Sequence, residues 1–76
     1  MNPDELWQSF ALAVIEPGAP EIQKIEMRRA FYAGMWGMFC LVVEASELPE
    51  SDAVQRMDLF HKQLKRFNEK LATGEA

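Results

Sequence analysis

The side chains that could perform chemistry are few in this chain and stand apart from one another. His61 is the only histidine and Cys40 the only cysteine. A general base or a zinc ligand needs partners within hydrogen-bonding or coordination distance, and neither residue belongs to a Cys/His cluster or an HExxH sequence. We therefore expect His61 at a boundary or in solvent, and Cys40, inside an apolar run, as a small buried hydrophobic residue. The sequence predicts no enzyme.

The acidic residues and the glycines also have structural explanations. Gly34 and Gly37 follow no strand, so they do not form a phosphate-binding loop. A single cysteine provides no internal disulfide, and we predict neither a metal site nor a cofactor. Helix capping and solubility account for the acidic groupings, which stand near expected helix beginnings and in loops. These groupings are Asp4 with Glu5, Glu47 with Glu50, and Asp52.

Two groups of basic residues remain as candidates for ligand binding. They could contact phosphate or an acidic protein surface, or they could form a solvated face with favourable charges near a helix C-terminus. The net charge of −4 and the presence of Glu69 within the second group favour the solvated face over nucleic-acid binding. The candidate partner-binding residues are Arg28 and Arg29 in the first group, and Lys62, Lys65, Arg66 and Lys70 in the second.

Periodicity and stop signals predict an all-α fold of three helices, with a long central one, in a single domain of residues 1–76. Asn2 can cap the first helix, and Pro17-Gly18-Ala19-Pro20 ends it. Pro49 interrupts the pattern a second time, and Gly74 is placed to stop the last helix. The expected helices cover about residues 3–15, 20–45 and 52–73, the last capped by Ser51 or Asp52.

The first and third expected helices each carry one apolar stripe. In the third helix the apolar residues recur at alternating steps of four and three, which is typical of a helix with one apolar side. The stripe of the first helix is Leu6, Trp7, Phe10, Ala13 and Val14, and that of the third is Ala53, Met57, Phe60, Leu64, Phe67 and Leu71.

The middle helix contains the uncharged run AFYAGMWGMFCLVV, residues 30–43. As a helix this run is about 21 Å long, less than the ~30 Å of a bilayer core, so we expect a core helix and no membrane span. Its apolar side chains lie on three faces, whereas the other two helices offer one stripe each. A second copy of the chain is the simplest cover for the third face, and a compact three-helix monomer is the alternative.

Glycines within this run call for a packing explanation, because each disfavours a helix by roughly 1 kcal/mol relative to alanine. Gly34 and Gly37 share a face with other small residues at spacings of three and four, where a second helix can approach the backbone closely. The sequence thus predicts a homo-oligomer, most simply a homodimer. The residues assigned to self-association are Ala30, Ala33, Gly34, Gly37, Met38, Phe39 and Leu41.

The segment QKIEMRRAFYAGMWGMF, residues 23–39, resembles a segment of small uncharacterised helical proteins of tailed bacteriophages and prophages, in which an E-M-R-R-A-F-Y-A-G-like run opens an apolar helix. The resemblance implies a phage or mobile-element origin and a helical, self-associating protein. It carries over no catalytic or ligand-binding residue. The N-terminal MNPDE lacks the basic region of a secretory signal, so the expected location is the cytoplasm, that of the host cell for a phage protein.

Two functional hypotheses stay open at the level of sequence. The first is a non-enzymatic interaction protein that self-associates and binds another, unidentified protein, which it inhibits or redirects. The second is a nucleic-acid-binding accessory protein that uses the basic face of the third helix. Salt dependence separates them, because phosphate binding weakens steeply as salt rises and an apolar protein interface does not.

Overall fold

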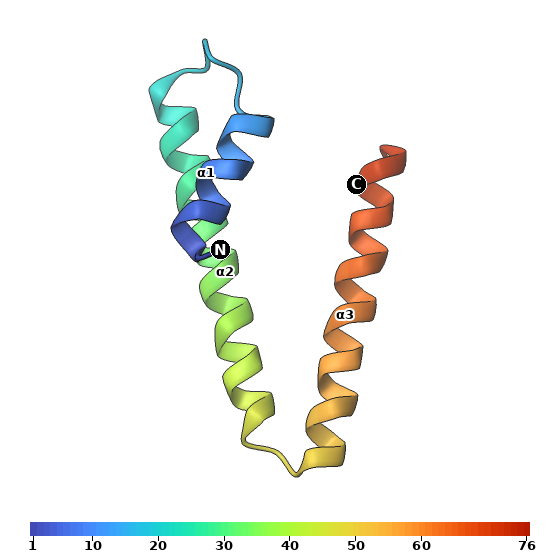
Figure 1. The fold of residues 1–76 in the computed structure, drawn as a ribbon. Coiled ribbons are helices and arrows are strands. Elements are labelled where there is room, and N and C mark those ends of the chain that lie inside the picture. Colours follow the sequence, from blue (N-terminus) through green and yellow to red (C-terminus); the bar gives the residue numbers. More distant parts are fainter. The chain divides into compact units, whose positions relative to one another are not determined.

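The computed structural model describes all 76 residues and contains three α-helices and no strand, so the predicted all-α fold is confirmed. Figure 1 shows α1 (Pro3–Val14), α2 (Glu21–Ser46) and α3 (Glu50–Thr73). The chain divides into two compact units, Met1–Phe39 and Cys40–Ala76. The first unit therefore contains α1 and most of α2, and the second contains the end of α2 and the whole of α3.

Helix α1 begins as its sequence predicts. Asn2 has an extended backbone, and its side-chain oxygen accepts a hydrogen bond of 2.9 Å from the backbone N–H of Glu5. Pro3 occupies the first turn, where a missing N–H costs nothing. The helix ends at Val14, one residue earlier than predicted, because Ile15 turns to an extended conformation while its N–H still donates to the carbonyl of Ala11.

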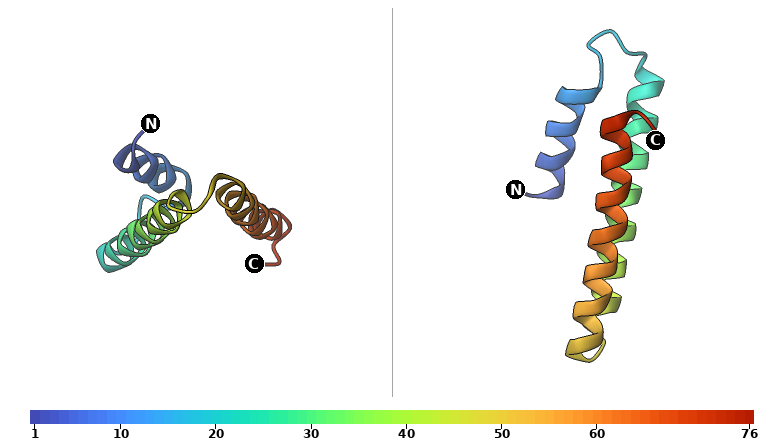
Figure 2. Two further views of the ribbon diagram at one scale, coloured as in Figure 1. Left: turned by 90° about the horizontal axis from the view of Figure 1, so that it is seen from below. Right: turned by 90° about the vertical axis from the view of Figure 1, so that its right-hand side faces the viewer.

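The connection between α1 and α2 is short and closes on itself through a backbone hydrogen bond of 3.0 Å from Ala19 to Glu16. The carbonyl of Pro20 accepts the N–H of Lys24, so α2 begins at Glu21, one residue after the predicted start. Figures 1 and 2 show α1 alongside the N-terminal half of α2 and running in the opposite direction. The contact between α1 and α2 is the only contact between helices within the first unit.

Helix α3 begins at Glu50, two residues before the predicted start, and the expected cap by Ser51 or Asp52 is wrong. Pro49 is the capping residue and makes no side-chain hydrogen bond. Its carbonyl accepts the N–H of Ala53 at 2.9 Å, so the helix starts directly after the proline. Ser51 and Asp52 therefore lie inside the first turn. There the negative charges of Glu50 and Asp52 interact favourably with the positive end of the helix dipole.

The C-terminal end of α3 follows the prediction. Gly74 adopts a left-handed backbone with φ of 78°, a conformation that side chains disfavour. Its N–H donates to the carbonyl of Leu71, and the N–H of Glu75 donates to that of Lys70. These bonds satisfy two carbonyls that would otherwise lack partners at the end of the helix.

Few side chains are buried, because each unit consists of one helix pair and a pair has a single interface. Ala45, at 1% exposure, is the only fully buried residue. Cys40 is exposed, so its prediction as a buried residue is wrong. The apolar residues next to Cys40 in the sequence do not bury it, because their side chains point to several sides of α2.

Candidate interaction surfaces

An aromatic cluster joins α1 to α2 in the first unit. The ring centroids of Trp7 and Phe31 lie 5.4 Å apart, those of Phe10 and Phe31 4.8 Å apart, and those of Trp7 and Phe10 5.9 Å apart. All three pairs are tilted, an arrangement that aromatic rings favour over a face-to-face sandwich. The three rings are half-buried, so they hold α1 in place without forming a closed core.

Tyr32 adds a polar contact to this cluster. Its hydroxyl donates a hydrogen bond of 2.6 Å to Oδ1 of Asp4 on α1. That hydrogen bond, together with some desolvation and the charge of the carboxylate, raises the pKa of Tyr32 above its ordinary value. The guanidinium of Arg28 lies over the Tyr32 ring, 5.6 Å from its centroid. Arg28, a predicted partner-binding residue, thus makes a contact within its own chain.

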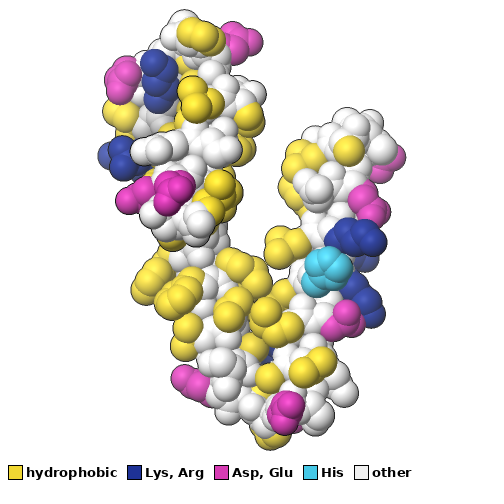
Figure 3. Space-filling model, in the orientation of Figure 1, with side chains coloured by type: hydrophobic (Ala, Val, Ile, Leu, Met, Phe, Trp, Pro, Cys, Tyr) yellow, Lys and Arg dark blue, Asp and Glu magenta, His cyan; other side chains and the backbone are white.

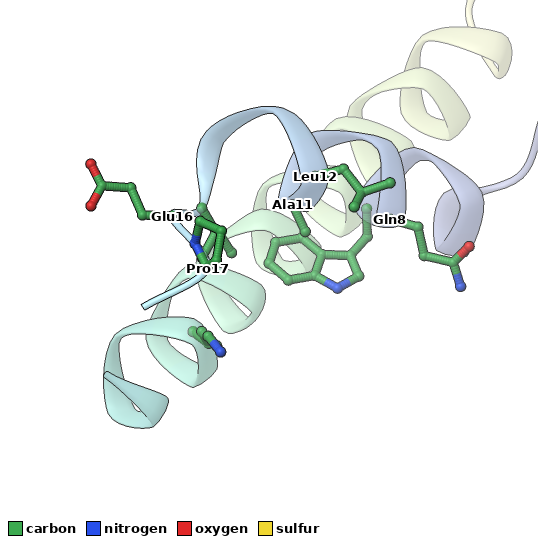
Figure 4. Close-up of a pocket in the computed structure, with 8 residues that line it drawn as sticks. Gln8, Ala11, Leu12, Glu16 and Pro17 are labelled. Atoms are coloured by element: carbon green, nitrogen blue, oxygen red, sulfur yellow. The ribbon is translucent and has the colours of Figure 1, made fainter. Parts of the chain in front are cut away.

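An open hollow of about 500 Å³ lies beside the cluster. Figure 4 shows Ala11, Leu12 and Pro17 around it, while the Glu16 carboxylate points away from them. No three His, Cys, Asp or Glu side chains gather in the chain closely enough to hold a metal ion. The hollow is a shallow apolar depression in the surface of the first unit, lined by Trp7, Gln8, Ala11, Leu12, Ile15, Glu16, Pro17 and Lys24.

The small residues of α2 form an open groove. A Cβ atom built on Gly34 or on Gly37 meets no atom within 4 Å beyond the helix's own backbone. The other members are exposed as well, so no part of the chain fills this face. We call this surface the small-residue groove, and its members are Ala30, Ala33, Gly34, Gly37 and Leu41.

The other two residues assigned to self-association lie elsewhere on α2. Met38 is half-buried and shares a face with Phe31 and Met35 by helical spacing. Phe39 is 58% exposed and stacks on Trp36, with centroids 5.9 Å apart. At roughly 100° per residue, Phe39 points away from the groove, on the opposite side of the helix. The seven residues therefore occupy three faces and not one surface.

Trp36 is a surface residue that the sequence-based assignment missed. At 67% exposure, it is the most exposed large side chain in the run AFYAGMWGMFCLVV. Its position three residues before Phe39 places both rings on one face, and this spacing was the signal available in the sequence. The Trp36–Phe39 pair gives α2 a second uncovered apolar face.

The basic candidates do not form a continuous positive surface. On α3, Lys62 pairs with Asp58 at 2.8 Å, and this hydrogen bond raises the pKa of Lys62. Figure 3 shows Lys and Arg interspersed with Asp and Glu along α3. The remaining candidates, Arg29, Lys65, Arg66 and Lys70, are exposed, and none of them makes an ion pair.

The apolar stripe of α3 is largely uncovered. Leu64, Phe67 and Leu71 are each more than half exposed, and Met57 is exposed as well. Only Ala53 and Phe60 are half-buried. Within the second unit, α2 contributes only Cys40–Ser46, too short a segment to cover a stripe of this length. Figure 3 shows hydrophobic side chains along one side of α3 and charged ones along another.

His61 is exposed, and its nearest neighbours along the helix supply no catalytic arrangement.

None of the three helices combines the length and the hydropathy that crossing a bilayer requires. Comparison of the chain with protein families, with curated proteins and with solved structures found no match. The uncovered apolar surfaces of α2 and α3 are therefore the main candidates for an interaction site in this chain.

Proposed function

We propose that this protein is a small non-enzymatic interaction module that self-associates through α2 and acts by binding another protein, which it inhibits or redirects. The resemblance of residues 23–39 to small phage and prophage proteins supports a phage or prophage origin, and with it a place of action in the cytoplasm of the host cell. Self-association gives a homodimer, because closed two-fold symmetry is the commonest way for identical chains to assemble.

The observation that carries this proposal is the open small-residue groove. Two glycines in a helix interior disfavour the helix by roughly 2 kcal/mol relative to alanine. Within the chain nothing compensates for this, since no atom lies within 4 Å of where either Cβ would be. A second helix seated in the groove would make many close backbone contacts there, and the dispersion energy of those contacts would offset the loss.

The size of the chain supports the same conclusion. A domain of this length has a marginal core even when it is compact, and small domains commonly gain stability by oligomerisation. Here Leu41, the largest side chain of the groove, stays exposed on α2. Covering it with a second copy removes apolar surface from water, which stabilises the assembly by about 25 cal/mol per Å² buried.

Light scattering tests this proposal directly. At tens of micromolar we expect a mass twice the 8.7 kDa of the chain. Gly37→Leu places a large side chain in the groove and should return the protein to a monomer that keeps its helical content. Gly18→Leu is the matched control, because Gly18 also has nothing within 4 Å but lies in the α1–α2 connection. A monomeric unmodified protein, or a Gly37→Leu variant that stays dimeric, would contradict self-association through the groove.

A further inference from the structure

The uncovered stripe of α3 has the spacing of a coiled-coil seam. Its steps alternate between four and three, so each pair of steps covers seven residues, the repeat that keeps one side of a helix against a partner helix. The seam extends over about 27 Å at the helical rise. In heptad notation, Met57, Leu64 and Leu71 take the a positions, and Ala53, Phe60 and Phe67 take the d positions.

The residues that flank this seam carry no negative charge. One side presents Val54, His61 and Asn68, and the other presents Arg56, Gln63 and Lys70. Neither Arg56 nor Lys70 makes an ion pair within the chain. The carboxylates of α3 lie elsewhere, Asp58 and Glu69 on the outer side and Glu50 and Asp52 in the first turn.

A second copy of α3 is a poor match for these flanks. In a parallel pair, Arg56 would face His61 of the second copy, and Lys70 would face position 75, where Glu75 lies beyond the end of the helix at Thr73 and so outside the seam. In an antiparallel pair, Arg56 would face Lys70 of the second copy. Neither orientation provides an attractive pair of charges between residues within α3, and the second places like charges together, which disfavours pairing.

We propose that the stripe of α3 binds an amphipathic helix of a different protein, whose apolar seam is flanked by glutamate or aspartate. Carboxylates at those positions would meet Arg56 and Lys70 across the interface, while the apolar seams bury Leu64, Phe67 and Leu71. This inference rests on the proposed function, since it names the surface and the chemistry by which the chain binds another protein. The proposed self-association uses residues of α2 and does not require the stripe of α3.

Two synthetic peptides of about four heptads test the inference, each with leucine along its seam and either glutamate or lysine at all flanking positions. Like charges keep each peptide from pairing with itself. At about 20 mM salt, where screening is weak, we expect the glutamate peptide to bind roughly tenfold more tightly than the lysine peptide in a calorimetric titration. Leu64→Glu should abolish binding of both.

Charge-reversal variants make the test specific to the flanks. The double variant Arg56→Glu with Lys70→Glu should reverse the preference and bind the lysine peptide more tightly. Its matched control is Lys65→Glu with Arg66→Glu, which changes the net charge of the protein equally at positions outside the flanks. The control should still prefer the glutamate peptide. Equal binding of the two peptides by the unmodified protein, or equal effects of the two double variants, would overturn the inference.

The same samples separate this inference from the proposed self-association. A protein that is dimeric by light scattering but binds neither peptide contradicts the α3 inference alone. A monomer that retains the glutamate preference contradicts self-association alone. If Leu64→Glu by itself dissociates the dimer or lowers the melting temperature of the free protein, the stripe is covered by a second copy or by its own chain, and the inference for a different partner fails.

Discussion

The hydrogen bond between Tyr32 and Asp4 links two residues that are 28 positions apart in the sequence. It favours the neutral phenol, which is why the pKa of Tyr32 is raised above its ordinary value of 10.0. Its stabilising effect is therefore fully present below the pKa of an unfolded tyrosine and is lost as pH rises through the raised pKa of the folded protein. The α1–α2 contact should accordingly weaken at strongly alkaline pH.

Absorbance titration can test this directly, since Tyr32 is the only tyrosine of the chain. We expect the tyrosinate midpoint of the folded protein to lie above that of the protein in denaturant. Asp4→Ala should lower the midpoint towards the denatured value, because it removes the acceptor. Asp52→Ala, a carboxylate change in the second unit, should leave the midpoint in place. Identical midpoints with and without denaturant would show that the hydrogen bond is absent in solution.

At the scale of the elements, α1 depends on its contact with α2. A helix of 12 residues is marginal in water by itself, even with a good N-cap. Phe31 contacts both Trp7 and Phe10, so it is the residue of α2 on which the position of α1 most depends. The α1 helix and its contact should thus form and disappear together.

Phe31→Ala should release α1. We expect a loss of roughly 2 kcal/mol from the first unit, below the ~3–5 kcal/mol of a fully buried phenylalanine because this ring is only half-buried. The helices contain 12, 26 and 24 residues, so the far-ultraviolet circular dichroism of helix should fall by about a fifth. Leu12→Ala, at an exposed position of α1, should change neither quantity. Unchanged helicity in Phe31→Ala would mean that α1 persists without the cluster.

At the scale of the whole molecule, Cys40 can report whether a second copy occupies the groove. It is exposed in the chain and follows Gly37 by three residues, so it lies at the edge of the small-residue groove. A helix seated against Gly37 would restrict access to the thiol. Since Cys40 is the only cysteine, every reaction with a thiol reagent reports on this one position.

The rate of thiol modification should depend on protein concentration. We expect the rate constant per thiol to fall several-fold between concentrations at which light scattering reports monomer and those at which it reports dimer. In Gly37→Leu the rate should stay constant across the same range. If the unmodified protein dimerises without any change in the rate, the dimer forms through another surface, such as the Trp36–Phe39 face.

The ends of the helices were determined mainly by nearby residues and could be predicted from the sequence. Asn2 satisfies a backbone N–H three residues away, and Gly74 takes the left-handed conformation that ends α3. Such interactions need no partner from a distant segment. The start of α3 was misplaced because two local signals compete there, and the backbone of Pro49 prevails over the side chains of Ser51 and Asp52.

Which faces of the helices are covered was decided only by the tertiary structure. The sequence shows that α2 is apolar on several sides, but helical spacing cannot say which side another helix will contact. The rings of Trp7 and Phe10 contact Phe31, which is half-buried, whereas Trp36 and Cys40 on the same helix are exposed. Burial depends on contacts between residues far apart in the chain, whereas a helix end depends on hydrogen bonds within one turn.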